Sequence, residues 1–375
     1  MNASPTSATT ICSEMTAVFS AWAQLHAERP PERARQTLQG FRGWHAHLLD
    51  AASLTCLVTK LDGRPELIYP VCRTEQVLMG VSRLHVLQAP GDLYWSCPEP
   101  IVGARGQAAI ERFVADIAGM SGWDVLETGP LPQSSAVLGW LEEAARRHRL
   151  LPERFAERES VGISLAGSWE SYCATRSRTM SQEVRKLSRQ GAIRLEDYRG
   201  GSDLPEKMSQ FFRVEASGWK GEQGTAIACN PTAMQFYVDL ATEAAAQGWL
   251  RLYLLYVDGQ CLAANFALCI GRTIHSEKIG FDAAWSRFSP GHVLRRLTLE
   301  RLFQTGDADL FDMLPGGGEH RGQKDAWGNC SRRFVRLRLH HPRSVMADVA
   351  RCARSSRSWM RDVGDRLRQK MQPAS

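Results

Sequence analysis

Two segments of the chain share one pattern of hydrophobic and turn-forming positions. Leu54–Arg73 and Leu252–Cys269 each contain a run rich in β-branched, aliphatic and aromatic residues, then Asp-Gly, then a second such run. Asp-Gly between two strand-like runs is the typical sequence of a two-residue hairpin turn. Each segment therefore predicts a β-hairpin. Because the two hairpins lie about one domain's length apart, we expect two copies of one domain.

The remaining periodicity predicts strands and helices in a similar order in both halves. In the first half, strands are expected in VSRLHVLQA and WDVLETG, and helices at about 107–119 and 134–148. In the second half, a helix capped by Ser168 runs to about Gln190, and another begins at Pro231 after Asn230 as its cap. The repeated order supports two related domains.

One strand of the second half is followed directly by a helix. TIHSEKIGFD is expected to form the strand, WSRFSPGH a loop, and the helix begins near His292. The first four N–H groups of a helix have no partner within it, and its dipole is positive at that end, so this arrangement suits a diphosphate. The chain has no GxGxxG after a strand and no GxxxxGK[ST], which disfavours NAD and ATP as ligands.

The residues of this loop have separate expected roles. Ser289 is positioned to cap the helix, and Gly291 leaves room for the diphosphate because it has no Cβ. Arginines nearby add positive charge. The expected cofactor-binding residues are Arg287, Phe288, Ser289, Pro290, Gly291, His292 and Arg295. The alternative is an ordinary capped helix start, since Ser-Pro-Gly also forms simple turns.

Composition places the chain among ordinary soluble proteins. It has 375 residues, of which 43% are hydrophobic and 23% charged, enough for about two domains. No run of about 18 apolar residues occurs, and the N-terminus lacks the basic start and apolar segment of a signal peptide, so a cytoplasmic location is expected. The ten cysteines form no CxxC pair, which predicts no zinc site.

The net charge of +6 is concentrated near the C-terminus. Residues 332–370 hold twelve Lys or Arg against three Asp, so the rest of the chain is nearly neutral and a nucleic-acid partner is not expected. Apolar residues at helical spacing predict a basic amphipathic helix over 343–371. This helix is expected either to dock on the body of the protein or to lie on the anionic inner face of the membrane.

These observations divide the chain into four expected parts. A disordered N-terminus is expected over 1–13, a first domain over 14–155, a second domain over 156–342 and the basic tail over 343–375. In the first domain, CPEPIVGARG occupies the position that corresponds to WSRFSPGH, with two prolines and a glutamate where phosphates would bind. We therefore expect the first domain to serve as scaffold and acceptor-site wall, and the second to be active.

Three blocks of the second half carry a resemblance to a known family. VEASGWKGEQGTA, EKIGFDAAWSRFSPG and DLFDMLPG are similar to the CelD/BcsL group of GNAT proteins, and more distantly to the FemABX transferases, over roughly residues 35–340. The resemblance implies an α/β (α+β) fold of tandem GNAT-like domains, each a mixed sheet flanked by helices. It also implies an N- or O-acyltransferase that uses acetyl-CoA or a longer acyl-CoA and no metal, and an acceptor from envelope, cellulose or exopolysaccharide synthesis.

Candidate catalytic residues lie on and after the strand TIHSEKIGFD. Lys278 and Asp282, four residues apart, are expected on one face of the strand, whereas Glu277 and His275 are expected on the other. Both Lys278 and Asp282 match the pattern of the resembling group. Asp282 is a candidate base, and the alternative is a structural ion pair with Lys278.

The acid that protonates the leaving thiolate is a tyrosine in many GNAT enzymes. PGGGEHRGQKDAWGN, the corresponding segment here, has none, which leaves His320 as a candidate acid or as a surface histidine without a role. Trp219, Lys220, Lys324 and Trp327 are candidate acceptor contacts, with a core position as the alternative for an isolated tryptophan.

Two other functions share this expected architecture. One is an aminoacyl-tRNA-dependent transferase of the FemABX kind, which would favour a coiled-coil arm for tRNA, and the sequence has no sustained heptad run. The other is a non-catalytic scaffold that binds acyl-CoA, which the missing tyrosine favours.

Overall fold

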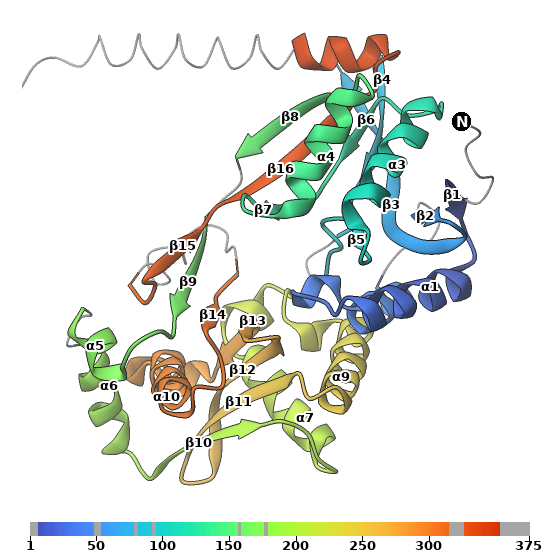
Figure 1. The fold of residues 1–375 in the computed structure, drawn as a ribbon. Coiled ribbons are helices and arrows are strands. Elements are labelled where there is room, and N and C mark those ends of the chain that lie inside the picture. The colour runs from blue at the N-terminus through green and yellow to red at the C-terminus, as the bar shows by residue number, and fades with distance from the viewer. Residues whose placement is uncertain are drawn as a thin grey trace, which may run out of the picture.

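The computed structural model describes residues 7–48, 54–78, 82–91, 95–156, 159–175, 179–314 and 326–352. These residues form a mixed α/β fold with two separate sheets, each flanked by helices (Figure 1). We call the first sheet with helices α1–α4 the first lobe, and the second sheet with helices α5–α10 the second lobe. Their helices are α1 Met15–Glu28, α2 Leu38–His47, α3 Gly106–Gly119, α4 Ala136–Arg147, α5 Trp169–Ala174, α6 Thr179–Ser188, α7 Leu204–Glu215, α8 Trp219–Glu222, α9 Pro231–Ala246 and α10 Pro290–Thr305. Short 3-10 helices are η1 Ala34–Gln36, η3 Ile227–Cys229 and η4 Ala283–Phe288.

The first sheet has nine strands in the order β1-β2-β3-β4-β6-β16-β7, with β5 beside β3 and β8 beside β16. Its strands are β1 Ala8–Cys12, β2 Leu54–Leu61, β3 Arg64–Leu78, β4 Ser82–Gln88, β5 Ile101–Val102, β6 Val125–Glu127, β7 Leu131–Pro132, β8 Leu151–Ala156 and β16 Phe334–His340. Among the described strand pairs of this sheet, only β4–β6 is parallel.

The second sheet has seven strands in the order β10-β11-β12-β13-β14-β9-β15. They are β9 Ser160–Ser164, β10 Ile193–Tyr198, β11 Leu250–Val257, β12 Gln260–Ile270, β13 Thr273–Phe281, β14 Leu310–Asp312 and β15 Cys330–Arg332. Among the described strand pairs of this sheet, β13–β14 is parallel and the others are antiparallel. Every residue of β11 is buried, because apolar helices cover both faces of the sheet.

The expected hairpins and caps are confirmed. Asp62 and Asp258 both have positive φ, of 51° and 47°, and each is followed by a glycine with positive φ, as a two-residue hairpin turn requires. The Ser168 hydroxyl accepts a hydrogen bond from the N–H of Ser171 at the start of α5. The Asn230 side chain accepts from the first N–H groups of α9. Local turn and cap chemistry therefore fixed these element ends.

Other expectations differ from the structure. Residues 8–12, expected to be disordered, form β1 at the edge of the first sheet. The segment 334–340, expected in the second domain, forms β16 in the first sheet between β6 and β8. The expected single helix over 168–190 is divided into α5 and α6. Pairing between strands about 180 residues or more apart has no local sequence signal, which explains the error at β16.

Helices between the two sheets join the lobes. One hydrophobic cluster contains buried residues of α1 and α2 together with residues of α7, α9, β11 and β12. A second cluster packs α3 and α4 on the first sheet, and a third packs α5 and α10 on the outer face of the second sheet. The chain is helical again at 345–352, where Ala347 and Ala350 are buried against Leu84, Val86 and Val125. Among the described helices, none is both long and apolar enough to cross a membrane.

Candidate functional site

Two parallel strands of the second sheet separate soon after they pair. β13 is hydrogen-bonded to β14 only over Thr273–His275, opposite Leu310–Asp312, although β13 continues to Phe281. From Ser276 onward, this edge of β13 is therefore not covered by β14. α10 begins nine residues after β13 ends and packs on β12, β13 and β11. We call the opening between β13 and β14 the splay.

A bulge in β13 changes which side chains point into this opening. Phe266 of β12 pairs with Lys278, but the next residue, Ala267, pairs with Ser276, so Glu277 has no opposite residue. One extra residue interrupts the strict alternation of side chains. As a result His275, Glu277 and Lys278 all line the same cavity. The expectation that Lys278 lies opposite to His275 and Glu277 was wrong for this reason.

A cavity of about 430 Å³ occupies the splay. One wall is β13, the end of β14 and the following turn. The other wall is Arg33 and the start of η1, with Ser96, Pro98 and Pro130 of the first lobe. Arg295 of α10 and Arg332 complete it. Residues of both lobes therefore form one cavity, which we call the splay cavity.

Glu277 is the buried carboxylate of this cavity. Its side chain is 2% exposed, and Oε2 accepts a hydrogen bond of 2.6 Å from Nη2 of Arg35 in the first lobe. Oε1 has no hydrogen-bond partner among the described residues. Burial raises the pKa of Glu277, and the charges of Arg35 and Lys278 oppose that rise. A carboxylate with one free, buried oxygen and a raised pKa is suited to accept a proton.

His275 lies beside it where β13 and β14 still pair. The imidazole is 3% exposed, its Nδ1 is 4.0 Å from Oδ2 of Asp312, and its Nε2 has no hydrogen-bond partner among the described residues. Burial lowers the pKa of His275 to about 4, so the ring is neutral at pH 7. Asp312 also accepts hydrogen bonds from the Ser160 hydroxyl and from Arg332 Nη1, at 2.9 and 2.7 Å.

Lys278 and Asp282 are not arranged as the sequence analysis expected. Lys278 lines the splay cavity, where burial and the charges of Arg35 and Lys220 lower its pKa. Asp282 follows the last residue of β13 and caps η4, since its Oδ1 accepts from the N–H of Ala284. Its Oδ2 is 3.5 Å from Nη1 of Arg213. The expected shared strand face is absent because the strand has ended before Asp282.

The expected cofactor residues surround the start of α10. Ser289 adopts the left-handed conformation with φ of 52°, and its carbonyl accepts from the N–H groups of His292 and Val293. Its hydroxyl does not cap the helix. A Cβ at Gly291 would meet Phe281 at 3.4 Å, an ordinary contact. Pro290 is the first residue of the helix.

Neighbouring side chains enclose this helix start. The guanidinium of Arg287 lies over the ring of the buried Phe288, at 4.6 Å. His292 Nδ1 is 3.2 Å from Oε1 of Glu183 in α6. Arg295 lies farther along α10 and lines the splay cavity, where burial lowers its pKa to about 10. This arginine therefore faces the splay cavity, whereas the sequence analysis expected it beside the diphosphate.

The expected acceptor contacts have other surroundings. Trp327 is 2% exposed and belongs to the hydrophobic cluster with α5 and α10, so it is a core residue. Lys220 Nζ donates to Oε1 of Glu215 and to the carbonyl of Ile279 in β13, at 3.0 and 2.8 Å. His320, Lys324 and the side chain of Trp219 lie outside the described residues.

Sequence reasoning did not assign a role to several cavity residues. Arg33 and Arg35 lie in the first lobe, more than 200 residues from β13, and Arg332 follows the second lobe's last helix. No sequence spacing brings these residues together. Among the described residues, no cluster of His, Cys, Asp and Glu could hold a metal ion.

Comparison with known proteins agrees with this geometry. Residues 174–321 match the family described as acetyltransferase (GNAT) domain. This segment contains α6–α10 and β10–β14, and therefore the splay. No curated protein matches the sequence.

Several solved structures have a similar fold across both lobes. The C-terminal DUF2156 domain of a protein from Agrobacterium fabrum named as a lysylphosphatidylglycerol synthetase is 13% identical, with a TM-score of 0.55, over 89% of this chain and 94% of that one. FemX is 10% identical, with a TM-score of 0.52, over 89% and 97%. L-PGS from Bacillus licheniformis is 10% identical, with a TM-score of 0.51, over 89% and 96%. The chain thus has a GNAT-type acyltransferase fold.

Proposed function

We propose that this protein is an acyltransferase that moves an acyl group from coenzyme A to an amine or hydroxyl of an acceptor in the splay cavity. The observation that carries the proposal is Glu277, a buried carboxylate with one free oxygen, at the place where β13 separates from β14. The match of residues 174–321 to a GNAT domain supports the same reaction class.

The proposed reaction is direct attack on the thioester. The acceptor nitrogen or oxygen forms a bond to the carbonyl carbon, Glu277 takes the proton that the nucleophile loses, and the C–S bond breaks. N–H groups of β13 beyond His275 polarise the thioester carbonyl, because β14 does not pair with that edge. The coenzyme A thiolate leaves and takes up a proton. His320 remains our candidate donor of that proton, outside the described residues.

The start of α10 is the proposed diphosphate site. Its positive dipole end and the Arg287 guanidinium favour an anion there. In the corresponding loop of the first lobe, Glu99 is buried and paired with Arg33, and a carboxylate there disfavours a diphosphate. The proposed donor site is therefore in the second lobe only.

The proposed acceptor is a precursor of an envelope polysaccharide or exopolysaccharide. This part rests on the sequence resemblance to the CelD/BcsL group. The fold likeness to FemX makes an aminoacyl-tRNA the alternative donor. Binding measurements distinguish the two donors.

Thermal unfolding with candidate donors tests the proposal. A ligand that binds only the folded state raises its melting temperature, so acetyl-CoA or a longer acyl-CoA should raise it, while ATP and NAD should not. Gly291→Val should abolish the shift without unfolding the protein, because the new side chain would obstruct the diphosphate. No shift with any CoA ester at about 100 times a micromolar Kd, where about 2.7 kcal/mol of stabilisation is expected, would contradict the proposal.

A further inference from the structure

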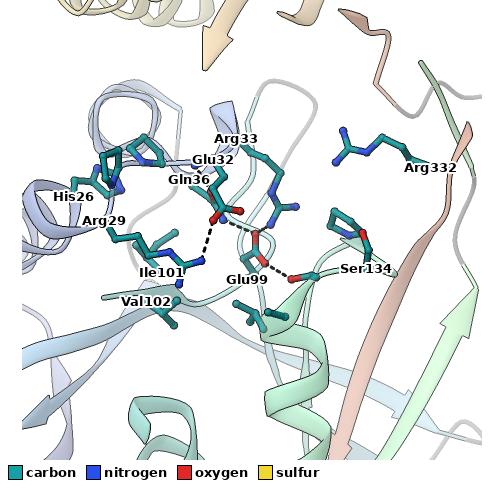
Figure 2. A pocket seen from close by; sticks show the side chains of 16 residues that line it. His26, Arg29, Glu32, Arg33, Gln36, Glu99, Ile101, Val102, Ser134 and Arg332 are labelled. Atoms are coloured by element: carbon teal, nitrogen blue, oxygen red, sulfur yellow. Dashed lines mark hydrogen bonds and ion pairs between the residues drawn. The ribbon is translucent and has the colours of Figure 1, made fainter. Parts of the chain in front are cut away.

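Two neighbouring cavities share lining residues from both lobes. Beside the splay cavity, a second cavity of about 360 Å³ lies between the end of α1, β5 and the start of α4 (Figure 2). We call it the lobe cavity. Arg33 and Arg332 line both cavities. These two arginines therefore stand between the two cavities, and we call them the arginine neck.

The two arginines come from different lobes. Arg33 precedes η1 in the first lobe, and Arg332 is the last residue of β15 in the second. Figure 2 shows Arg332 extending toward Arg33 from the opposite side of the lobe cavity. The shape of the neck thus depends on both lobes.

A buried carboxylate holds each arginine. Arg33 is paired with Glu99, which is 0% exposed, and Arg332 Nη1 donates to Oδ2 of Asp312 at 2.7 Å. A guanidinium has five N–H donors, and one carboxylate takes at most two of them. Both arginines therefore keep donors for a ligand.

The charges at the neck favour an anion. The splay cavity is lined by five cationic side chains, Arg33, Arg35, Lys278, Arg295 and Arg332, against two carboxylates, Glu277 and Asp312, with Glu99 behind Arg33. Burial, followed by the charge of Arg332, lowers the pKa of Arg33 to about 10. Arg33 and Arg332 are both partly buried, so their like charges repel each other, and an anion between them removes that repulsion.

The start of α4 adds a second source of positive potential. Ser135, Ala136 and Val137 line the lobe cavity, and they are the cap and first residues of a 12-residue helix. The Ser135 hydroxyl is 3.5 Å from Oε2 of Glu99 and does not cap its own helix. The helix start therefore presents its N–H groups without a side-chain cap.

Two buried polar atoms in the splay cavity indicate that a ligand belongs there. His275 Nε2 and Glu277 Oε1 have no hydrogen-bond partner among the described residues, although both side chains are more than nine-tenths buried. Buried polar atoms are seldom left unpaired. His275, Arg33 and Arg332 all line the splay cavity, so a ligand in this cavity can contact both the imidazole and the neck.

We propose that the arginine neck binds a phosphate group of the acceptor, while the acceptor's amine or hydroxyl reaches Glu277. Phosphate fits better than carboxylate, because its tetrahedral oxygens can accept hydrogen bonds from guanidiniums on two opposite walls, whereas a planar carboxylate matches one guanidinium. The identity of the reacting group rests on the proposed function; the phosphate site itself does not.

Binding of inorganic phosphate, followed by phosphorus NMR in the presence of desulfo-CoA, tests the neck. Arg332→Gln should weaken phosphate binding by about tenfold or more, since it removes a charge-assisted contact. Arg333→Gln is the matched control, because the neighbouring Arg333 is 73% exposed and paired with Glu159. It should bind phosphate as the unsubstituted protein does.

A second variant tests phosphate binding without leaving a buried charge unpaired, so that the protein stays folded. Arg33→Gln combined with Glu99→Gln neutralises both partners, so no buried carboxylate is left unpaired. This double variant should keep the melting temperature within a few degrees and still lose phosphate binding by about tenfold. Phosphate binding that is absent from the unsubstituted protein, or equal in all variants, overturns the proposal.

Binding to vesicles distinguishes a lipid headgroup from a soluble phosphorylated acceptor as the ligand of the neck. Co-sedimentation with vesicles of phosphatidic acid in phosphatidylcholine that Arg332→Gln abolishes and Arg333→Gln does not would support a lipid headgroup at the neck. Phosphate binding without co-sedimentation would support a soluble phosphorylated acceptor. Acyl-CoA affinity is measured separately on the same variants. If the protein does not bind acyl-CoA but still binds phosphate through the arginine neck, the proposed function is wrong and the phosphate site is supported.

Discussion

At the scale of single residues, burial decides the chemistry of the splay cavity. It raises the pKa of Glu277 and lowers that of His275, because each charged form loses its hydration. Arg35 crosses from the first lobe to hold Glu277 and lies 4.6 Å over the ring of Trp95. The cavity therefore contains a carboxylate that can take a proton and a neutral imidazole. Both properties can be tested by substitution.

Glu277→Gln should lower turnover by about 10² to 10⁴, the usual contribution of a positioned base, and leave acyl-CoA affinity nearly unchanged. Asp282→Asn is the matched comparison, since Asp282 caps η4 and contacts Arg213 outside the cavity. It should lower the melting temperature and leave turnover per folded molecule intact. Steady-state rates and melting temperatures on the same preparations decide between the two carboxylates. A large loss of turnover in Asp282→Asn alone would restore that residue as the base.

Arg35→Gln should move the acid limb of kcat/KM to higher pH. Activity requires ionised Glu277, and the charge of Arg35 opposes the rise in the pKa of Glu277, so its removal lets that pKa rise further. Arg42→Gln, at an exposed position of α2, is the control and should leave the limb in place. If the acid limb of kcat/KM does not move in Arg35→Gln, the ionisation of Glu277 does not control the rate.

His275 should make the folded protein sensitive to acid. The pKa of His275 is about 4 in the folded protein and 6.5 for an ordinary histidine, so between these two pH values the unfolded chain binds an extra proton. Stability is therefore full above about pH 6.5 and falls as the pH approaches 4, by about 2–3 kcal/mol. In His275→Gln, urea unfolding should show a smaller loss of folding stability between about pH 6.5 and pH 4. His85→Gln, half exposed on the first sheet, should keep the loss.

At the scale of elements, the close approach of α7 to β13 fixes the strand beside the cavity. A Cβ added at Gly280 would lie 2.3 Å from Cα of Glu215, which is backbone and cannot move aside easily. The bulge at Glu277 and this contact together set the path of β13. Even the methyl group of an alanine at position 280 would therefore clash with the backbone of α7.

Gly280→Ala should lower the free energy of unfolding by about 1–3 kcal/mol, the usual effect of overpacking. Gly139→Ala is the matched control, because Gly139 is an exposed position inside α4 with nothing within 4 Å of the added Cβ. It should raise stability by about 0.5–1 kcal/mol, the helix propensity difference. Urea unfolding of both variants checks the sign. If the two variants changed the free energy of unfolding by the same amount, α7 would have moved to make room for the new methyl group at position 280.

Elements with local signals could be predicted from the sequence, and those set by distant pairing could not. Asp62-Gly63 and Asp258-Gly259 require positive φ at two successive residues, which few sequences allow, so both hairpins were found. The bulge has no such signature, because strand periodicity does not reveal one extra residue. It alone moved Glu277 and Lys278 into one cavity. Asp282 was assigned to the strand because the sequence does not mark the end of β13 at Phe281, one residue before it.

At the scale of the whole molecule, the two lobes depend on each other. β16 returns from the second lobe to pair with β6, β7 and β8 of the first sheet. The first lobe in turn supplies Arg33 and Arg35 to the splay cavity. The first lobe thus forms one wall of the splay cavity. Hydrophobic contacts of α1 and α2 with α9 hold the wall in place.

Hydrogen–deuterium exchange with and without acetyl-CoA tests the central claim most directly, because it reports where a donor binds along the backbone. We expect acetyl-CoA to slow exchange in Ser276–Phe281, at the uncovered edge of β13, and in the first turn of α10, while α3 of the first lobe exchanges at an unchanged rate. Slowed exchange at α3, or no change in β13 and α10 at saturating acetyl-CoA, would contradict the assignment of acyl transfer to the splay of the second lobe.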